Sequence, residues 1–229
     1  PHGFLCPFVL RARKIFQEAV MSGKGWDEMV SPEIARHWED WLKSAESKLK
    51  EVKVPRRTSD GTERKELEEI HIFMDASNLG LGAVAYRVTQ SEMGGPRKVC
   101  FLLARTKVTP MKAVSIPRLE LMSAELGLRV ATEIRKAHEV PLDHIHFWSD
   151  AEDVLCWLRT QSRRLSTFVA HRVAKLQDGT LVSNWRKIPG KLNPADVASR
   201  GSRLEELLEY TVWWNGPEFL RGGPSEWPD

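Results

Sequence analysis

Two aspartates stand at points where predicted strands end, which is where a sheet can bring distant carboxylates together. Asp75 closes the β-prone run at residues 70–74, and Asp150 closes a second run at residues 145–148. If these strands are parallel neighbours, their carboxyl ends hold the two side chains side by side. Two unpaired anions at that separation repel each other and shift each other's pKa, and a divalent cation removes the conflict.

Two further acids lie at the start of predicted helices. Glu120 falls in the first turn of a helix expected at residues 117–137, and Asp196 in the first turn of a final helix expected at residues 194–199. Oxygen ligands from separated positions suit Mg²⁺ or Mn²⁺ and are wrong for structural zinc. Two such ions, about 3.5–4 Å apart, activate water and stabilise the leaving oxygen in phosphodiester hydrolysis. Each acid alone is also explained as a turn former or as a residue favoured at a helix N-terminus, so the signal is their joint order.

The alternation of apolar and polar residues predicts the elements that would position these acids. Strands are expected at residues 70–74, 81–88, 99–104, 145–148 and 181–188, and helices at residues 117–137, 151–158, 167–176 and 194–199. The two strand–helix–strand passages imply parallel pairings beside an antiparallel meander. We therefore predict an α/β fold in which a five-stranded mixed sheet is flanked by helices.

The residues before this sheet predict a helical extension. Ser31 and Pro32 mark a helix start, because proline is tolerated at the first helical position. An apolar stripe at helical spacing follows, and we expect it to pack on a neighbouring domain. The stripe consists of Ile34, Trp38, Trp41, Leu42 and Leu49.

The remaining segments are assigned by composition. An earlier helix is expected at about residues 9–21, a polar linker at residues 58–68, and a helix with an irregular connection towards a following domain at residues 202–229. The opening reads as mid-domain sequence, so we interpret the chain as a piece of something longer. No apolar run approaches the roughly 18 residues that span a bilayer, and no signal-peptide pattern opens the chain.

The distribution of charge is more informative than the net charge of +3. Residues 97–118 carry six basic residues and no acidic one, and residues 154–177 repeat the pattern with five. Locally cationic stretches favour contacts with phosphate, although either stretch alone could equally be a solvated face. The second stretch contains Arg159, Arg163, Arg164, Arg172 and Lys175.

The cysteines and histidines point away from zinc. Cys6, Cys100 and Cys156 are far apart and lie among apolar neighbours, which predicts reduced, buried thiols in an intracellular protein. His144 and His146 alternate in a predicted strand, and no cysteine or histidine nearby in the sequence completes a metal site.

Taken in order, the runs FMDAS, ELMSAELGL, WSDAEDVL and NPAD resemble the four motifs of the ribonuclease H family. The segments SIPRLEL, FWSDAEDVL and NPADVASRG resemble more closely the ribonuclease H portion of Bel/Pao retrotransposon polyproteins, and GFLCPFVLRARKIFQEA and WWNGPEFL look like its flanking regions. The resemblance implies a ribonuclease H-like fold over residues 69–201. It also implies that residues 1–57 end a reverse-transcriptase region, that the tail leads towards an integrase, and that the protein works in cytoplasmic particles.

By motif position, the resemblance implies that Asp75 bridges two Mg²⁺ or Mn²⁺ ions, that Glu120 and Asp150 hold one of them, and that Asp196 holds the other. Water would attack the RNA strand of an RNA/DNA hybrid during reverse transcription. Glu125 is the rival for the helix acid, but it lies about 140° around the helix from Glu120, so both cannot face one site. The Glu-Leu-x-x-Ala spacing favours Glu120.

The family also places a basic helical platform for the DNA strand between the fourth and fifth strands. The matching residues here are Arg159, Arg163, Arg164 and Arg172. Many ribonucleases H carry a histidine, thought to assist product release, in the loop before the last acid. The corresponding loop at residues 188–193 has none, and Lys191 is our candidate for a partial substitute that contacts nucleic acid.

Three other functions fit parts of the pattern. An inactive ribonuclease H-like module, from a decayed or domesticated copy, would serve architecture or nucleic-acid binding, but connection domains of that kind lack the four acids. A transposase or integrase core takes its glutamate from a late helix, whereas Glu120 follows the third predicted strand. An aspartic peptidase needs Asp-Thr-Gly or Asp-Ser-Gly, and Asp75, Asp150 and Asp60 begin other tripeptides.

Overall fold

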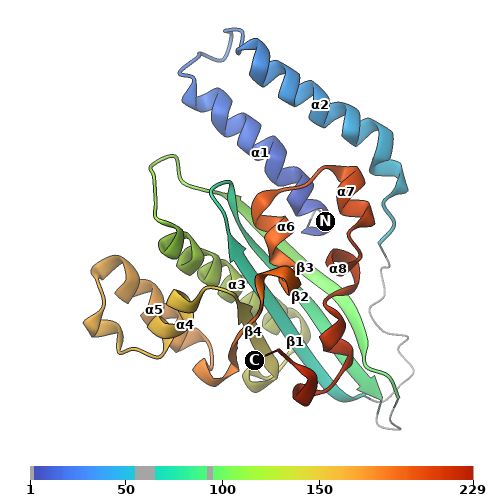
Figure 1. Cartoon of the computed structure of the whole chain (residues 1–229), viewed down its shortest axis with the longest axis vertical. Coiled ribbons are helices and arrows are strands. Elements are labelled where there is room, and N and C mark those ends of the chain that lie inside the picture. Colours follow the sequence, from blue (N-terminus) through green and yellow to red (C-terminus); the bar gives the residue numbers. More distant parts are fainter. Residues whose placement is uncertain (1–2, 55–64, 92–94, 229) are drawn as a thin grey trace.

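A five-stranded mixed sheet with the strand order β3-β2-β1-β4-β5 forms the centre of the protein (Figure 1). The computed structural model describes residues 3–54, 65–91 and 95–228. The strands are β1 (Lys65–Ala76), β2 (Gly80–Ser91), β3 (Lys98–Val108), β4 (Ile145–Ser149) and β5 (Trp185–Lys187). The first three strands form an antiparallel meander, and β4 pairs in parallel with both β1 and β5. The α/β fold predicted from the sequence is confirmed.

Three helices cover one face of the sheet: α3 (Ile116–His138), α4 (Glu152–Leu158) and α5 (Thr167–Gly179). The β1 side chains of Ile72 and Met74 are fully buried beneath them. Gly127 allows α3 to lie close to β1, because a Cβ at this position would stand 2.2 Å from the sulfur of Met74. The long helix ends where Glu139 adopts a left-handed conformation with φ 56°.

The opposite face is covered by segments from both ends of the chain (Figure 1). These are α1 (Cys6–Met21), α6 (Ala195–Arg200), α7 (Leu204–Glu209) and α8 (Thr211–Asn215), followed by the C-terminal tail. The indole nitrogen of Trp213 donates to the carbonyl of Phe4 at 2.9 Å, and the hydroxyl of Tyr86 donates to the carbonyl of Trp213 at 2.8 Å. The two ends of the chain therefore belong to one apolar core.

The helix α2 (Pro32–Lys48) runs beside α1 as the second arm of a helical hairpin (Figure 1). Its start was predicted correctly, because the Ser31 side chain accepts a hydrogen bond from the backbone of Ile34. From the predicted stripe, Trp41 stacks on Phe8 with ring centroids 4.8 Å apart. Trp38, Leu42 and Leu49 are exposed, so only part of the stripe is covered within the described residues.

Several boundaries differ from the sequence-based expectation. Strand β1 begins at Lys65, inside the stretch expected to be a linker, while residues 58–64 of that linker lie outside the described residues. Strand β5 is three residues long, because the preceding residues form a 3-10 turn and the Asn184 amide binds the carbonyl of Ile145 at 3.0 Å. The helix expected within residues 202–229 is present as two short helices, α7 and α8.

The short 3-10 helices lie mainly in the connections. They are Gly3–Leu5, Leu49–Glu51, Leu142–His144, Ser162–Arg164, Val182–Asn184, Gly190–Leu192, Glu218–Arg221 and Pro224–Glu226. No helix in the described part of the chain has the length and apolarity needed to cross a membrane.

The cysteines correct an expectation. All three are free thiols, but only Cys6 is buried, whereas Cys100 is half-buried and Cys156 is exposed. Cys156 lies on the short helix α4, whose buried residues are Val154, Leu155 and Leu158, so its side chain faces outward.

We expect Trp213→Ala to destabilise the protein by about 3–5 kcal/mol, because a fully buried indole and its hydrogen bond to Phe4 are lost. Urea unfolding followed by circular dichroism measures the change. Trp26 is 93% exposed, so Trp26→Ala is the matched control and should change stability by less than about 0.5 kcal/mol. Equal effects of the two substitutions would contradict the role of Trp213 in joining the chain ends.

Candidate active site

The parallel pairing of β1 with β4 sets the position of two acids. His71 lies opposite His146, and Phe73 opposite Trp148. Because side chains alternate along a strand, Asp75 lies on the same side of β1 as His71 and Phe73. On the neighbouring chain segment Asp150 directly follows the end of β4. The carboxyl ends of the two strands thus carry the two aspartates, as the sequence predicted.

Glu120 joins the aspartates from α3. One carboxylate oxygen each from Asp75, Glu120 and Asp150 lies within 4.8 Å of the other two. Glu120 does not lie in the first turn of its helix as expected, because the helix begins at Ile116 after the N-cap residue Ser115. This earlier start places Glu120 in the second turn.

Asp75 and Glu120 are buried and Asp150 is half-buried, and no described residue forms an ion pair with any of the three. Asp75 and Glu120 are 4% and 9% exposed. Burial raises the pKa of Asp75 to about 7. The hydrogen bond from Ser199 lowers this pKa, and the charge of Asp150 raises it. Burial and the charges of both aspartates raise the pKa of Glu120 to about 8. The pKa of Asp150 is also raised, mainly by burial.

The fourth predicted acid lies beside this group without belonging to it. Asp196 is in the first turn of α6, as expected, and its charge acts on Asp75 and Asp150. Its carboxylate is held by Arg200, whose Nε donates to Oδ1 at 2.5 Å. The structure therefore brings three of the four acids together and leaves Asp196 paired at the edge.

A glycine lets α6 approach the sheet. A Cβ on Gly82, the β2 residue paired with Asp75, would lie 2.7 Å from the Cβ of Ala198 and 2.9 Å from the backbone oxygen of Ala195. This close packing places the hydroxyl of Ser199 where it donates to Asp75. The approach of α6 to β2 thus orients one of the clustered carboxylates.

Asn193 is a site residue that the sequence reasoning missed. Its side-chain nitrogen donates to the carbonyl of Met74 at 3.0 Å and lies 3.5 Å from Asp150 Oδ1. Its side-chain oxygen accepts from the backbone of Ala195 at 3.1 Å. Asn193 therefore ties the ends of β1 and β4 to the start of α6. The NPAD run contained the signal, but we interpreted only its aspartate.

The residues of the group fit divalent cations. Glu120 Oε2 is buried and, among the described residues, has no hydrogen-bond partner. Hard, uncompensated carboxylate oxygens are ligands that Mg²⁺ and Mn²⁺ prefer. An ion here would satisfy the orphaned oxygen and compensate the burial and the repulsion that raise the pKa values of the acids.

Glu125, the rival helix acid, is engaged elsewhere. Its carboxylate lies 3.1 Å from both Arg172 Nε and Lys175 Nζ on α5. Arg172 also stacks over the ring of Phe168, with 3.7 Å between the guanidinium carbon and the ring centroid. The choice of Glu120 over Glu125 as the helix acid agrees with this geometry. Because Arg172 already contacts Glu125 and Phe168, it is less available to bind phosphate than expected.

The other predicted nucleic-acid contacts lie on exposed surface. Arg159 and Arg163 border one shallow depression at the end of α4, and Arg164 is exposed next to them. Lys191 is exposed in the turn that precedes α6. That turn adjoins the acids, since a Cβ on Gly190 would lie 3.0 Å from Asp150 Oδ2.

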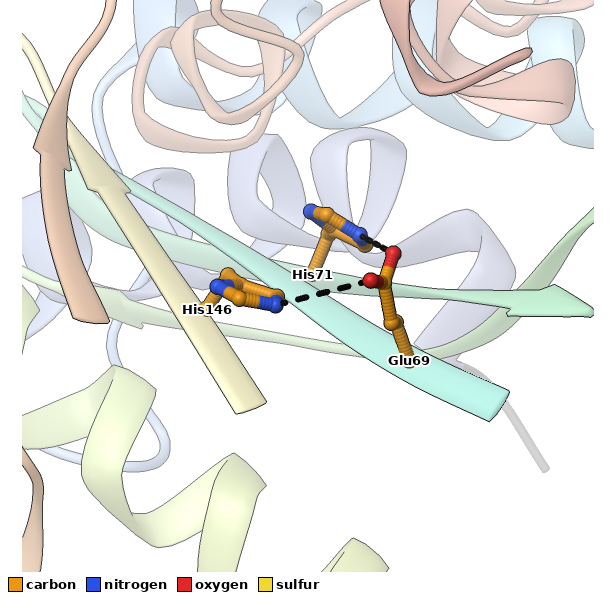
Figure 2. A group of neighbouring side chains, drawn as sticks. All are labelled: Glu69, His71 and His146. Atoms are coloured by element: carbon orange, nitrogen blue, oxygen red, sulfur yellow. Dashed lines mark hydrogen bonds and ion pairs between the residues drawn. The ribbon is translucent and has the colours of Figure 1, made fainter. Parts of the chain in front are cut away.

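A second polar group, which the sequence did not predict, lies at the other end of the same two strands. Figure 2 shows Glu69, His71 and His146, with both imidazoles directed towards the carboxylate of Glu69. His71 Nε2 lies 3.2 Å and His146 Nε2 4.0 Å from its oxygens. His71 had escaped notice because it lies on β1, far in sequence from His146.

Hydrogen bonding favours an internal network over a metal at this second group. The Trp148 indole donates to His71 Nδ1 at 3.1 Å, so the proton of neutral His71 is on Nε2 and points to Glu69. A metal on Nε2 would require an imidazolate. Arg97 also pairs with Glu69. Burial lowers the pKa of His146 to about 4, which keeps its ring neutral at pH 7.

Comparison with known proteins identifies the family. Residues 1–151 match the Pao retrotransposon-like RNaseH-like domain. The chain belongs to this family. No curated protein matches it. Among solved structures, ribonuclease H1 from the halophilic archaeon Halobacterium salinarum is similar at 15% identity, over 62% of this chain and 97% of that one, with a TM-score of 0.28; at that score the likeness supports no argument.

The match to the Pao retrotransposon-like RNaseH-like domain includes most of the site. Asp75, Glu120 and Asp150 lie within the matched residues, together with α1 and α2. Asp196 lies beyond them, so its assignment depends on the geometry around α6. The family membership agrees with the ribonuclease H resemblance inferred from the four sequence motifs.

Asp75→Asn should stabilise the metal-free protein by about 1–3 kcal/mol at pH 8. The folded-state pKa of Asp75 is raised from 3.8 to about 7, so ionisation destabilises the fold increasingly between pH 4 and 7 and fully above pH 7. The gain should therefore disappear as the pH falls towards 4. Urea unfolding in EDTA at pH 8 and pH 4.5 measures it, with the exposed Asp143→Asn as control. A less stable Asp75→Asn protein at pH 8 would contradict the assigned cost of burial.

Gly82→Ala should destabilise the protein by about 1–3 kcal/mol, because the added Cβ meets α6 at backbone atoms that cannot rotate away. It should also weaken Mg²⁺ binding in calorimetry, since Ser199 moves with α6. At Gly25 an added Cβ meets only the Glu28 side chain at 3.7 Å, so Gly25→Ala is the control. Unchanged stability and metal affinity for Gly82→Ala would show that α6 does not depend on this contact.

Proposed function

We propose that this protein is a ribonuclease H that hydrolyses the RNA strand of RNA/DNA hybrids during retrotransposon reverse transcription. The observation that carries the proposal is the group formed by the buried Asp75 and Glu120 and the half-buried Asp150, whose charges no described residue neutralises by an ion pair. Membership of a retrotransposon RNaseH-like family supports it. In this proposal residues 1–57 end the reverse-transcriptase region, which is the partner within the same polyprotein, and the element acts in cytoplasmic particles.

Divalent ions, when bound, would supply an activated water and stabilise charge on the leaving oxygen. Asp75, Glu120 and Asp150 would hold them. Ser199 orients Asp75, and Asn193 fixes the approach of α6 to the strand ends. Asp196 would contribute the remaining ligand after its carboxylate turns from Arg200, and the released Arg200 would be free to contact a substrate phosphate.

The substrate would be held through its backbone. Arg159, Arg163 and Arg164 form an exposed cationic patch beside α4, and contacts of this kind follow phosphate positions with little sequence preference. Recognition of 2′-hydroxyl groups would distinguish the RNA strand. Lys191 follows Gly190, which adjoins Asp150, in the loop where many ribonucleases H carry a histidine, and in this proposal it contacts the cleaved phosphate.

Cleavage of an end-labelled RNA/DNA hybrid by the purified chain tests the proposal. We expect cutting of the RNA strand alone with Mg²⁺ or Mn²⁺, none in EDTA, and a loss of more than about a hundredfold in Asp150→Asn. Asp143→Asn should cleave like the wild type. A folded chain that binds the hybrid without cutting it would overturn the proposed ribonuclease H activity and favour an inactive nucleic-acid-binding copy.

A further inference from the structure

A groove of about 1100 Å³ separates the α1–α2 hairpin from the segment that joins α6 to α7. Its floor includes Phe8, Trp41 and Ser202, and its walls carry charged side chains from all three elements. The Ser202 backbone donates to the carbonyl of Pro7 at 3.3 Å, which closes the groove where α1 meets the start of α7. The lining comes mainly from two separate stretches of the chain, α1–α2 and residues 200–206, so the groove is an open channel between them.

Positive charge is in excess along this groove. The basic lining residues are Arg11, Lys14, Arg36, Lys43, Arg200 and Arg203. Within the described ranges, only Arg200 among them has a carboxylate within ion-pair distance. The lining contains four acidic residues, so its six basic residues leave an excess of positive charge; the acidic residues are Glu18, Asp40, Glu205 and Glu206. The field in the groove therefore favours an anionic occupant.

Two lining residues connect the groove to the candidate active site. Arg200 contributes to its lining and binds the carboxylate of Asp196. Leu79 also lines it, in the turn between β1, whose end carries Asp75, and β2. A strand whose phosphate lies at the acids would pass Arg200 and reach the cations of α1 and α2. The groove lies along α6 and α7, whereas the Arg159 patch lies at α4, so the two surfaces flank the acids on different elements.

We propose that this groove binds the phosphate backbone of the nucleic acid beyond the cleavage position, with the α1–α2 hairpin as its outer wall. This inference rests on the proposed function, because a hybrid at the acids sets the direction of the strand. Arg36 and Lys43 lie on α2, away from the acids, and contact the substrate only when it is long enough to reach the hairpin. The hairpin thereby extends the binding site without taking part in hydrolysis.

The test measures binding of fluorescent RNA/DNA hybrids of two lengths to the whole chain without divalent metal. We expect Arg36→Gln/Lys43→Gln to weaken binding of a long hybrid roughly tenfold at low salt and to reduce the slope of log K against log salt by about 2. Binding of a short hybrid that only reaches the acids should be unchanged. The control Arg135→Gln/Lys136→Gln removes two equally exposed charges from the far end of α3.

Equal binding of the long hybrid by wild type and Arg36→Gln/Lys43→Gln would overturn the groove, as would an equal loss in the control. Because binding is measured without cleavage, the two proposals fail separately. A chain that never cuts RNA but shows the length-dependent loss keeps the groove and loses the enzyme. Normal cleavage of RNA, with no length-dependent loss of binding in Arg36→Gln/Lys43→Gln, would support the enzyme and overturn the groove.

Discussion

The parallel pairing of β1 with β4 holds Asp75 and Asp150 at adjacent strand ends, where burial and the charges of neighbouring acids raise the pKa of both carboxyl groups. Glu120 adds a third charge to the same space from α3. Apolar packing on both faces of the sheet holds the strands and α3 that carry these groups, and so keeps them together despite this cost. The fold therefore stores an unfavourable interaction that a bound cation would reverse.

The two faces of the sheet make separate contributions to this arrangement. On one face, the absence of a side chain at Gly127 brings α3 down onto β1, which carries Glu120 to the strand ends. On the other face, Gly82 plays the same part for α6, which brings Ser199 to Asp75. The face that carries α6 is completed by α1 and the C-terminal tail, so the ends of the chain are needed to hold the helix in place. Stability and site geometry consequently depend on residues far apart in the sequence.

The sequence predicted the elements with a strong local signal, and the acids among them. The β-prone runs before Asp75 and Asp150 and the Ser31 cap are local features, and the structure confirms them. What could not be predicted depended on tertiary contact. The shortness of β5 follows from Asn184 binding carbonyls across the chain, and the role of Asn193 appears only when three elements meet. The exposed side of Cys156 likewise depends on which face of α4 is buried.

The same strand register places two polar groups on β1 and β4, the histidine group around Glu69 and the acidic group around Asp75. The two groups differ in how far their carboxylates are compensated by positive charge. His71 and His146 form one rung, Phe73 stacked near Trp148 forms the next, and the two aspartates follow. The group around the histidines contains one carboxylate, which is compensated by Arg97 and by the proton of His71. The acidic group contains three carboxylates, and no described cation pairs with any of them. The aromatic rung lies between the two groups, so the histidine group is an internal brace, whereas the acidic group is neutralised by protons or by a bound cation.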